Sequence, residues 1–382
     1  MLSNQRYLFN LDAGVTYINC AYMSPMLKAV EAAGIEGLQI KRHPWVLRTD
    51  NFFEPARELG RQFAALIGSN DPDRVCVLPS VSYGMATVAR NVKLAAGDNI
   101  VGLSEQFPSN VYSWMRAASD TGAELRLITD PDAEHDRTAA WNQRVLDAID
   151  ERTKLVAMPQ VHWADGTLFD LVAIGKRARE VGALLVIDGT QSIGAYPFNA
   201  QEIQPDAVIC ASYKWLMGSY SIGVAWYGPA FDGGVPIEES WITRKDSEQF
   251  AQLVNYKDDY RPGAFRYNVG EMSNFVLLPM MLEGMKQVNA WGTAAIQEYV
   301  AAISGPALTR LAEAGFRVPP SNERGAHLFG IRAPEGTNPN DLKARLDAAN
   351  IIVSMRGDAV RVAPHVYNSE AELNLLADTL IG

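Results

Sequence analysis

Short apolar runs rich in β-branched residues alternate, through the first two thirds of the chain, with stretches whose apolar residues recur every three or four positions. The apolar runs occupy 75–79, 99–103, 125–129, 154–159, 183–188, 206–212 and 222–227. Between them, 83–95, 110–119 and 171–181 have the spacing of amphipathic helices. Strands that are buried on both faces have continuous apolar sequences. The alternation therefore predicts an α/β fold, a mostly parallel sheet covered by helices.

The pattern changes near residue 280. A long amphipathic helix is expected through Ala290 and beyond. Shorter elements follow, with strands expected at 327–332, 351–356 and 360–364 and helices at 340–349 and from 369. We therefore expect a large domain over 1–280 and a smaller α+β domain over 281–382. The polar segment 238–263, with scattered aromatic residues, is expected to be a long loop of functional importance.

Composition narrows the class of protein. The 382 residues are 48% hydrophobic and carry a formal net charge of -10, with no block of basic residues, which argues against nucleic acid or an anionic membrane as a partner. The three cysteines are far apart and form no CxxC motif, so reduced thiols and a cytoplasmic location are expected. No signal pattern opens the chain, and the longest apolar run is too short to span a bilayer. A small-molecule enzyme fits these features best.

Two charged residues end apolar runs. Lys214 follows the run 206–212, where apolar surroundings can lower the pKa of an amine and allow it to form a Schiff base; a solvated lysine is the alternative. Asp188 ends the run 183–188, either as a cap or turn residue or as a buried carboxylate with a cationic partner. Together they match a pyridoxal phosphate site, in which a lysine holds the aldehyde carbon and an aspartate keeps the pyridine nitrogen protonated.

Such a cofactor makes further demands that the sequence can meet. Its phosphate needs a helix N-terminus, and the segment 80–84 opens a predicted helix, although a plain serine cap would look the same. Its ring needs an apolar cover, which Phe107 could supply unless it is a core residue. A substrate carboxylate needs a guanidinium, and Arg361 or Arg356 could provide it unless each forms a surface salt bridge.

The segment VIDGTQSIGAYPFN…DAVICASYKWLMGSYSIGVAWYG resembles the cofactor-binding signature of the class V aminotransferase family of fold-type I pyridoxal phosphate enzymes. That family includes cysteine desulfurases, kynureninases and isopenicillin N epimerase-like proteins. The resemblance extends over nearly the whole chain, through YINCAYMSP, LSEQFPSNVYSW, RPGAFRYNVGEMSNF and VRVAPHVYNS. It implies that the N-terminal segment 1–25 approaches the active site and that two subunits form a homodimer.

The resemblance also implies roles for individual residues. Lys214 would bind the cofactor covalently, Asp188 would pair with the pyridine nitrogen, and Gln191 would hydrogen-bond the phenolic oxygen of the ring. The remaining implied roles are phosphate binding by Val81 and Ser82, with Ser212 and Tyr213 beside them, ring stacking by Phe107, α-carboxylate binding by Arg361, and a contact from Asn274 to the phosphate in the partner subunit.

Departures from the family pattern refine the prediction. Ala211 and Tyr213 stand where desulfurases have serine and histidine, so the phosphate site is closer to that of kynureninase-like members. The interval 356–360 lacks the nucleophilic cysteine of desulfurases and has no room for a mobile loop, which disfavours a cysteine desulfurase of the usual kind. Cys20 lies in the segment that approaches the pocket, either as a buried apolar residue or as a nucleophile.

His162 follows the expected strand 154–159, at a position where relatives often have serine or asparagine near the cofactor. It could serve as a second acid/base group or make a structural hydrogen bond. The other histidines are dispersed, and no metal site is expected.

The sequence therefore predicts a pyridoxal phosphate enzyme that acts at the α-carbon of an amino acid or related amine, of the aminotransferase or epimerase type. A carbon–sulfur or carbon–carbon lyase of the kynureninase or sulfoxide-lyase kind is the first alternative. A non-catalytic protein that binds pyridoxal phosphate is the second.

Overall fold

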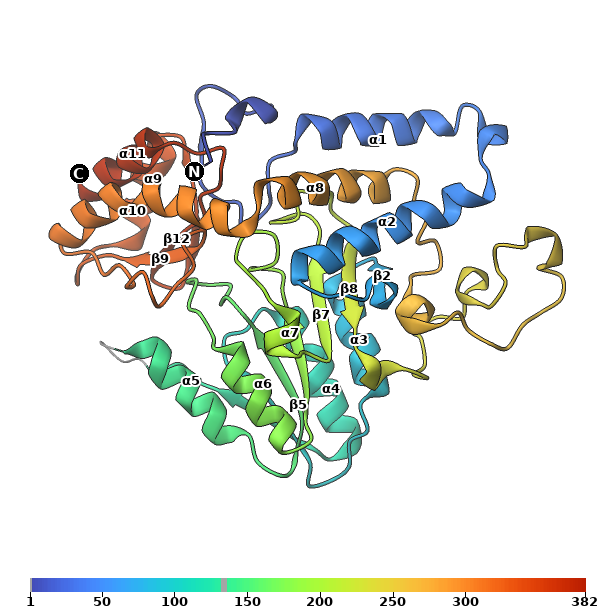
Figure 1. The fold of residues 1–382 in the computed structure, drawn as a ribbon. Coiled ribbons are helices and arrows are strands. Elements are labelled where there is room, and N and C mark those ends of the chain that lie inside the picture. The colour runs from blue at the N-terminus through green and yellow to red at the C-terminus, as the bar shows by residue number, and fades with distance from the viewer. Residues whose placement is uncertain (1, 132–135) are drawn as a thin grey trace.

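The fold is built around a central seven-stranded sheet with the order β2-β8-β7-β6-β5-β3-β4, in a computed structural model that describes residues 2–131 and 136–382 (Figure 1). The strands are β2 (Val75–Leu78), β3 (Asn99–Leu103), β4 (Glu124–Ile128), β5 (Thr153–Pro159), β6 (Leu184–Asp188), β7 (Ala207–Ala211) and β8 (Gly223–Tyr227). β8 is antiparallel to both of its neighbours, and the other pairs are parallel. The predicted α/β fold with a mostly parallel sheet is confirmed.

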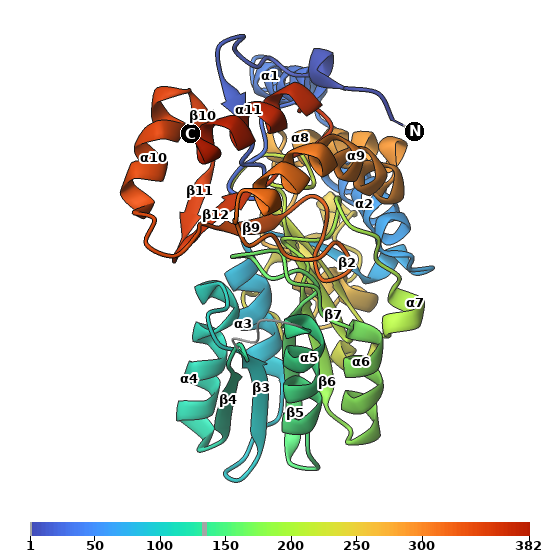
Figure 2. The same ribbon diagram turned by 90° about the vertical axis from the view of Figure 1, so that its left-hand side faces the viewer.

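Helices cover both faces of this sheet (Figure 2). Their bounds are α3 (Val81–Asn91), α4 (Tyr112–Thr121), α5 (Arg137–Ala148), α6 (Leu171–Glu180) and α7 (Ala200–Ile203). Strand β5 shows why its sequence is continuously apolar: Leu155 and Ala157 pack in the core with α3 and α4, whereas Val156 and Met158 pack in the core with α5 and α6. Successive side chains of a strand point to opposite faces, so each face needs its own apolar set.

The expected helix over 83–95 begins two residues earlier and ends at Asn91. Its N-terminus is set by Ser80, whose side chain accepts a hydrogen bond of 3.2 Å from the backbone N–H of Tyr83. The helix therefore starts directly behind β2, at the carboxyl edge of the sheet.

The C-terminal part carries a smaller antiparallel sheet with the order β11-β12-β9. Its elements are α9 (Thr293–Glu313), β9 (Phe329–Arg332), α10 (Pro339–Ala348), β10 (Ile351–Ile352), β11 (Ser354–Arg356), β12 (Ala359–Val362) and α11 (Glu370–Ile381). The expectation of one long helix through Ala290 is wrong. The chain forms α8 (Leu277–Trp291) and then α9, because Gly292 between them has a φ of 76°, which a helix cannot contain.

The N-terminal segment joins the two parts of the chain. Strand β1 (Thr16–Tyr17) pairs in parallel with β10, and helices α1 (Lys28–Ile40) and α2 (Thr49–Ile67) lie beside α8 (Figure 1). Leu278 and Met281 of α8 share a core with the central sheet, whereas Trp291 packs with the C-terminal elements. The domain boundary near 280 stays a prediction.

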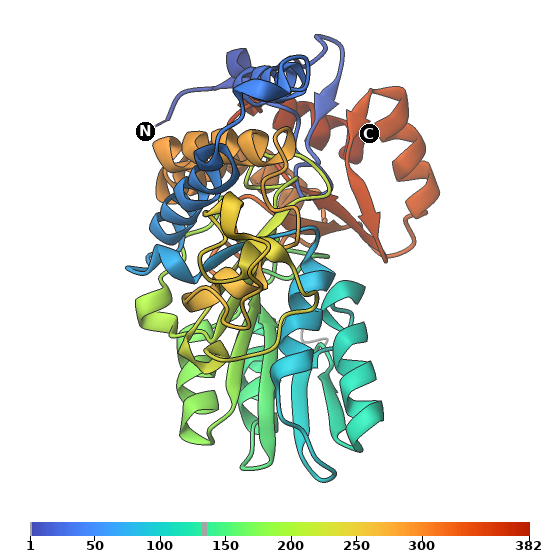
Figure 3. The same ribbon diagram turned by 90° about the vertical axis from the view of Figure 1, so that its right-hand side faces the viewer.

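The segment 238–263 projects beside α2, as Figures 1 and 3 show in yellow to orange. It contains two short 3-10 turns, the first residue of a third, and an isolated β-bridge between Arg244 and Tyr260. The ring of Phe52 in α2 contacts Trp241 and Phe250 in this segment. The 3-10 turns of the chain are η1 (Arg6–Leu8), η2 (Pro44–Val46), η3 (Pro72–Arg74), η4 (Pro108–Asn110), η5 (Pro229–Phe231), η6 (Trp241–Thr243), η7 (Phe250–Gln252) and η8 (Gly263–Tyr267). In the described residues, no helix has both the length and the hydrophobicity to cross a membrane.

Candidate active site

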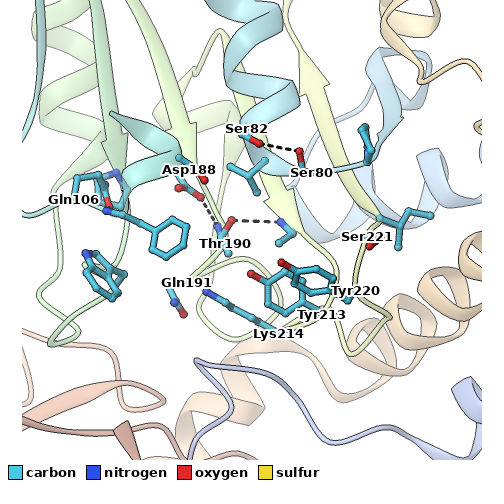
Figure 4. Close-up of a pocket in the computed structure, with 18 of the residues that line it drawn as sticks. Ser80, Ser82, Gln106, Asp188, Thr190, Gln191, Tyr213, Lys214, Tyr220 and Ser221 are labelled. Atoms are coloured by element: carbon cyan, nitrogen blue, oxygen red, sulfur yellow. Dashed lines mark hydrogen bonds between the residues drawn. The ribbon is translucent and has the colours of Figure 1, made fainter. Parts of the chain in front are cut away.

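A cavity of about 320 Å³ opens at the carboxyl edge of the central sheet (Figure 4). Strands β2, β3, β5, β6 and β7 run in the same direction, so the loops that follow them meet at this edge. The lining includes Pro79, Ser80, Val81, Ser82, Gln106, Phe107, Trp163, Asp188, Thr190, Gln191, Tyr213, Lys214, Tyr220 and Ser221. We call it the sheet-edge cavity.

Lys214 lies in the loop after β7, with its amine directed into the sheet-edge cavity (Figure 4). Its side chain is 6% exposed, and no carboxylate in the described part of the chain forms an ion pair with it. Burial, and next the positive charge of Arg361, lower the pKa of the amine to about 8 in spite of the opposing charge of Asp188. An amine with this pKa is partly neutral near physiological pH, which suits it to nucleophilic and proton-transfer chemistry.

Asp188 ends β6 on the opposite wall of the same cavity (Figure 4). The backbone N–H of Thr190 donates a hydrogen bond of 3.1 Å to its carboxylate. Burial raises the pKa of the carboxyl group, although the hydrogen bonds from Thr190 and the charge of Lys214 lower it. Among the described residues it has no ion-pair partner. A buried carboxylate of this kind fits the protonated ring nitrogen of pyridoxal phosphate.

The N-terminus of α3 forms a third wall. Ser80 and Ser82 hydrogen-bond to each other through their hydroxyl oxygens at 2.9 Å, and Val81 and Ser82 begin the helix and line the cavity. The first N–H groups of a helix have no acceptor within it, and the helix dipole favours an anion at this end. This wall fits the phosphate group of the cofactor.

Phe107 and Trp163 form an aromatic cover. Their ring centroids are 5.5 Å apart in an edge-to-face arrangement, and the Trp163 indole N–H donates a hydrogen bond of 2.6 Å to the carbonyl of Glu105. The Lys214 amine is 5.5 Å from the centroid of the Phe107 ring. Phe107 therefore lines the sheet-edge cavity, and its stacking role stays a prediction.

Gln191 links the sheet-edge cavity to the N-terminal segment. Its side-chain amide donates to the carbonyl of Ala21 at 3.2 Å and accepts from the indole N–H of Trp215 at 2.9 Å. The backbone carbonyl of Gln191 is 2.8 Å from Nε2 of His327. These contacts fix the orientation of the amide, which keeps a second N–H for a ligand.

Arg361 borders a second cavity of about 330 Å³, which Lys214 and Phe107 also line. Nη1 of Arg361 donates to the Trp163 carbonyl at 2.9 Å, and Nη2 donates to Ser354 Oγ at 3.3 Å. Burial and the charge of Arg356 lower the pKa of the guanidinium to about 9, so it stays charged at neutral pH. We call this space the substrate cavity; Ala21, Tyr22 and Met23 of the N-terminal segment also line it.

Three of the predicted site residues lie outside these cavities. Ser212 is fully buried between Ala211 and Tyr213, which face the sheet-edge cavity, because side chains alternate along extended backbone. Asn274 accepts hydrogen bonds from the backbone N–H groups of Val276 and Leu277 at the start of α8, so a contact with a partner subunit stays a prediction.

His162 is the third of these residues. It is buried, with Nδ1 3.3 Å from Asp165 and its ring against Trp141, and it lines a neighbouring cavity instead. This placement supports the structural alternative, and we assign His162 no part in proton transfer.

The three cysteines are buried free thiols. Burial raises the pKa of each thiol above its ordinary value. Cys20 lies beside Tyr367, whose hydrogen bond only partly offsets this rise. The interval between Arg356 and Arg361 closes as a tight turn at Gly357 and Asp358, with no cysteine in it. These thiols lack the exposure and the low pKa of a reactive cysteine.

Sequence reasoning missed several cavity residues, among them Gln106, Thr190, Tyr220 and Ser221. Thr190 matters most, since it holds Asp188 and its Oγ1 accepts a hydrogen bond of 3.3 Å from the backbone N–H of Ala211. The sequence could have indicated this role, because Thr190 lies two residues after a carboxylate that ends a strand. Ser and Thr at such positions commonly stabilise a turn.

The buried lysine and the buried carboxylate, set at the carboxyl edge of a mostly parallel α/β sheet beside a free helix N-terminus, define a pyridoxal phosphate-dependent enzyme. The family model for Aminotransferase class-V matches residues 43–373. The chain belongs to the class V aminotransferase family, which confirms the predicted resemblance and its cofactor.

Similar proteins agree with this family. An uncharacterized aminotransferase, YcbU, of Bacillus subtilis (strain 168) is 25% identical over 320 residues, 84% of this chain and 81% of that protein. Isopenicillin N epimerase of Amycolatopsis lactamdurans is 24% identical over 414 residues, 99% of this chain and 97% of that protein. A structure of a C-DES variant with glycine covalently linked to its pyridoxal phosphate matches with a TM-score of 0.86 at 16% identity, covering 99% of each chain. The last likeness shows a shared fold.

Proposed function

We propose that the enzyme acts at the α-carbon of an amino acid or a related amine, as an aminotransferase- or epimerase-like enzyme. One observation carries the proposal: Lys214 and Arg361 line the same substrate cavity. An amine and a guanidinium that share one cavity can act on the same carbon atom. The amine can exchange the proton on that carbon, and the guanidinium can bind the carboxylate attached to it.

Each residue then has a defined task. Bound pyridoxal phosphate supplies an electron-withdrawing ring next to the α-carbon. Asp188 keeps a positive charge on the ring nitrogen, and Lys214 takes and returns the proton at the α-carbon. Arg361 binds the α-carboxylate and sets the direction of the bond that breaks. Phe107 and Trp163 exclude water from one side of the site.

The lining residues bear on the reaction type. Apart from Lys214, the titratable side chains that line the two cavities in the described residues are Asp188, Arg356, Arg361 and the tyrosines Tyr22, Tyr213 and Tyr220. Transfer of an amino group needs one group that moves the proton, and Lys214 meets that need. Epimerisation by two groups would require a tyrosine on the opposite face. A route through a cysteine persulfide is disfavoured, because every thiol is buried.

The test uses the enzyme loaded with pyridoxal phosphate in heavy water, with a panel of L-amino acids, each with and without a 2-oxo acid. Deuterium at the α-carbon, followed by NMR, is expected for at least one amino acid, and Lys214→Ala should abolish it. A new amino acid formed from the 2-oxo acid indicates transfer, and inversion of the α-carbon indicates epimerisation. Loss of the substrate side chain without transfer, with release of ammonia for a carbon–sulfur lyase or of alanine for a carbon–carbon lyase, indicates the lyase alternative. Absence of exchange with every amino acid would overturn the proposal.

We also propose a cytoplasmic homodimer. The family resemblance supports two subunits, as does the group of exposed apolar side chains on α1 and after it: Ile35, Leu38, Trp45 and Val46. Three free thiols support a reducing compartment. Light scattering of the purified protein tests the dimer, and a mass of 41.9 kDa, that of one chain, would contradict it.

A further inference from the structure

A hairpin places two arginines on one face of the small sheet. Strands β11 and β12 pair with Ser354 opposite Arg361 and Arg356 opposite Ala359. The turn between them has Gly357 at its first position, with a φ of 57° that glycine adopts without strain. Directly paired residues share a face, and so do residues two apart on a strand. Arg356 is therefore a diagonal neighbour of Arg361 on the same face.

Both guanidiniums border the substrate cavity, with Lys214 and Tyr22. Arg361 is 1% exposed and its Nε has no partner. The guanidinium of Arg356 lies 5.2 Å from the Trp163 ring; its Nη1 donates to the Met355 carbonyl at 2.7 Å, and its Nε also has no partner. Two charged side chains thus keep unused donors at one cavity.

No acidic side chain in the described residues neutralises these two arginines. The lining of the substrate cavity contains no carboxylate. Arg356 also borders the cavity that contains His162, where Asp130 and Asp165 pair with Arg137 and Asp358 pairs with Arg332 at 3.1 Å. Glu105 lines that cavity too, but in the described residues it forms no ion pair with Arg356, and no carboxylate acts on the Arg356 guanidinium. A substrate with a single carboxylate would therefore leave one guanidinium uncompensated.

We propose that the substrate is an amino acid with a second acidic group, and that Arg356 binds this group while Arg361 binds the α-carboxylate. The inference rests on the proposed function for the assignment of Arg361. Diagonal neighbours across an antiparallel pair are about 7–8 Å apart. This is a distance between backbone positions, and the two long side chains that start from it both reach the substrate cavity. One ligand that carries two acidic groups can therefore meet both guanidiniums. The Trp163 ring beneath Arg356 keeps the guanidinium plane in place.

The test measures binding and requires no turnover. Calorimetry on the enzyme loaded with pyridoxal phosphate compares dicarboxylates without an amino group, succinate, glutarate and adipate, with monocarboxylates of equal chain length. We expect the best dicarboxylate to bind at least about tenfold more tightly than its monocarboxylate, because it makes a second charge-assisted contact. Arg356→Gln should remove this preference and leave monocarboxylate binding within about twofold. Arg361→Gln should weaken both series.

Arg317→Gln is the matched control. Arg317 is an exposed arginine that borders the neighbouring cavity and not the substrate cavity, so its loss changes the net charge by the same amount and should keep the preference. Equal affinity of the unmodified enzyme for dicarboxylates and monocarboxylates would overturn the inference. So would an equal loss of affinity for both kinds of ligand in Arg356→Gln, if the unfolding temperature of that variant is unchanged. Because the ligands have no α-amine, these outcomes are independent of whether the enzyme exchanges the α-proton.

Discussion

The main-chain carbonyl of Trp163 accepts a hydrogen bond of 2.9 Å from Nη1 of Arg361. Ser354 accepts a second one from Nη2, and its own hydroxyl donates to Asn19 Oδ1 at 3.0 Å. The loop after β5, the hairpin strand β11 and the N-terminal segment thus orient one guanidinium. The two contacts fix the orientation of the guanidinium plane through Nη1 and Nη2. They therefore determine which edge of Arg361 meets a carboxylate.

Ser354 is accordingly a positioning residue, and Ser354→Ala is expected to raise KM for the amino acid substrate about three- to tenfold. One neutral hydrogen bond contributes about 1 kcal/mol, and Ser354 does not reach the α-carbon, so kcat should change less than twofold. Steady-state kinetics separate the two constants. Ser354→Thr keeps the hydroxyl on a β-branched residue suited to a strand and should restore KM. A fall in kcat at constant KM would contradict this role.

Most strands could be predicted because burial on both faces leaves a strong local signal, although β4, at the edge of the sheet, is partly exposed. Each of the seven expected apolar runs coincides with a strand of the central sheet. Lys214 and Asp188 stood out for the same reason, because Asp188 is the last residue of one such run and Lys214 lies two residues beyond another. The order of the strands, which brings the two residues to opposite walls of one cavity, depends on contacts distant in sequence and has no local signal.

Side-chain direction in the loops was harder to predict. Whether Ser212 or Tyr213 faces the cavity depends on how far extended backbone continues past the end of β7. His162 and Trp163 are adjacent and both line the neighbouring cavity, yet of the two only Trp163 also lines the sheet-edge cavity. The turn at Gly166 supports the loop that carries them: an added Cβ at this glycine would lie 1.9 Å from the Leu328 carbonyl, a long-range contact that the sequence does not reveal.

The buried amine of Lys214 is expected to destabilise the protein once pyridoxal phosphate is removed. Its folded pKa is lowered to about 8 from 10.5, so the unfolded chain holds the proton more tightly between these values and stability rises with pH across that window. Lys214→Met removes the buried charge. It should stabilise the cofactor-free protein by about 2–3 kcal/mol at pH 7, with the gain shrinking as pH rises above 8.

Denaturant unfolding at pH 7 and pH 9.5 measures this difference. Lys286→Met is the control, because Lys286 lies exposed on α8 and pairs with Glu283. Its effect should be small and equal at both pH values. A gain for Lys214→Met that stays constant with pH would show that better packing, and not the buried charge, is responsible.

Asp188→Asn should have opposite effects on the two forms of the protein. Burial raises the folded pKa of Asp188 above its unfolded value, so stability falls as the pH rises from the unfolded pKa through the folded pKa, and the full loss is present above the folded pKa. Asparagine keeps an oxygen for the Thr190 N–H without the charge, and the cofactor-free variant should unfold at a higher temperature than the unmodified protein at pH 7. It cannot pair ionically with a protonated ring nitrogen, so its affinity for pyridoxal phosphate should fall about tenfold or more.

Thermal unfolding and equilibrium dialysis distinguish these two effects. Asp206→Asn is the matched control, because Asp206 is another aspartate whose pKa burial raises, it accepts a hydrogen bond of 2.8 Å from the Leu185 N–H, and it precedes β7 at the far end from the cavity. Its replacement should leave cofactor affinity unchanged. If Asp188→Asn instead lowered the unfolding temperature of the cofactor-free protein, the carboxylate would be an internal structural acceptor rather than a group held for a cationic ligand. Stability without the cofactor and affinity for the cofactor change in opposite directions for one reason. The buried charge of Asp188 costs folding free energy when it is unpaired, and it contributes binding free energy when the ring nitrogen neutralises it.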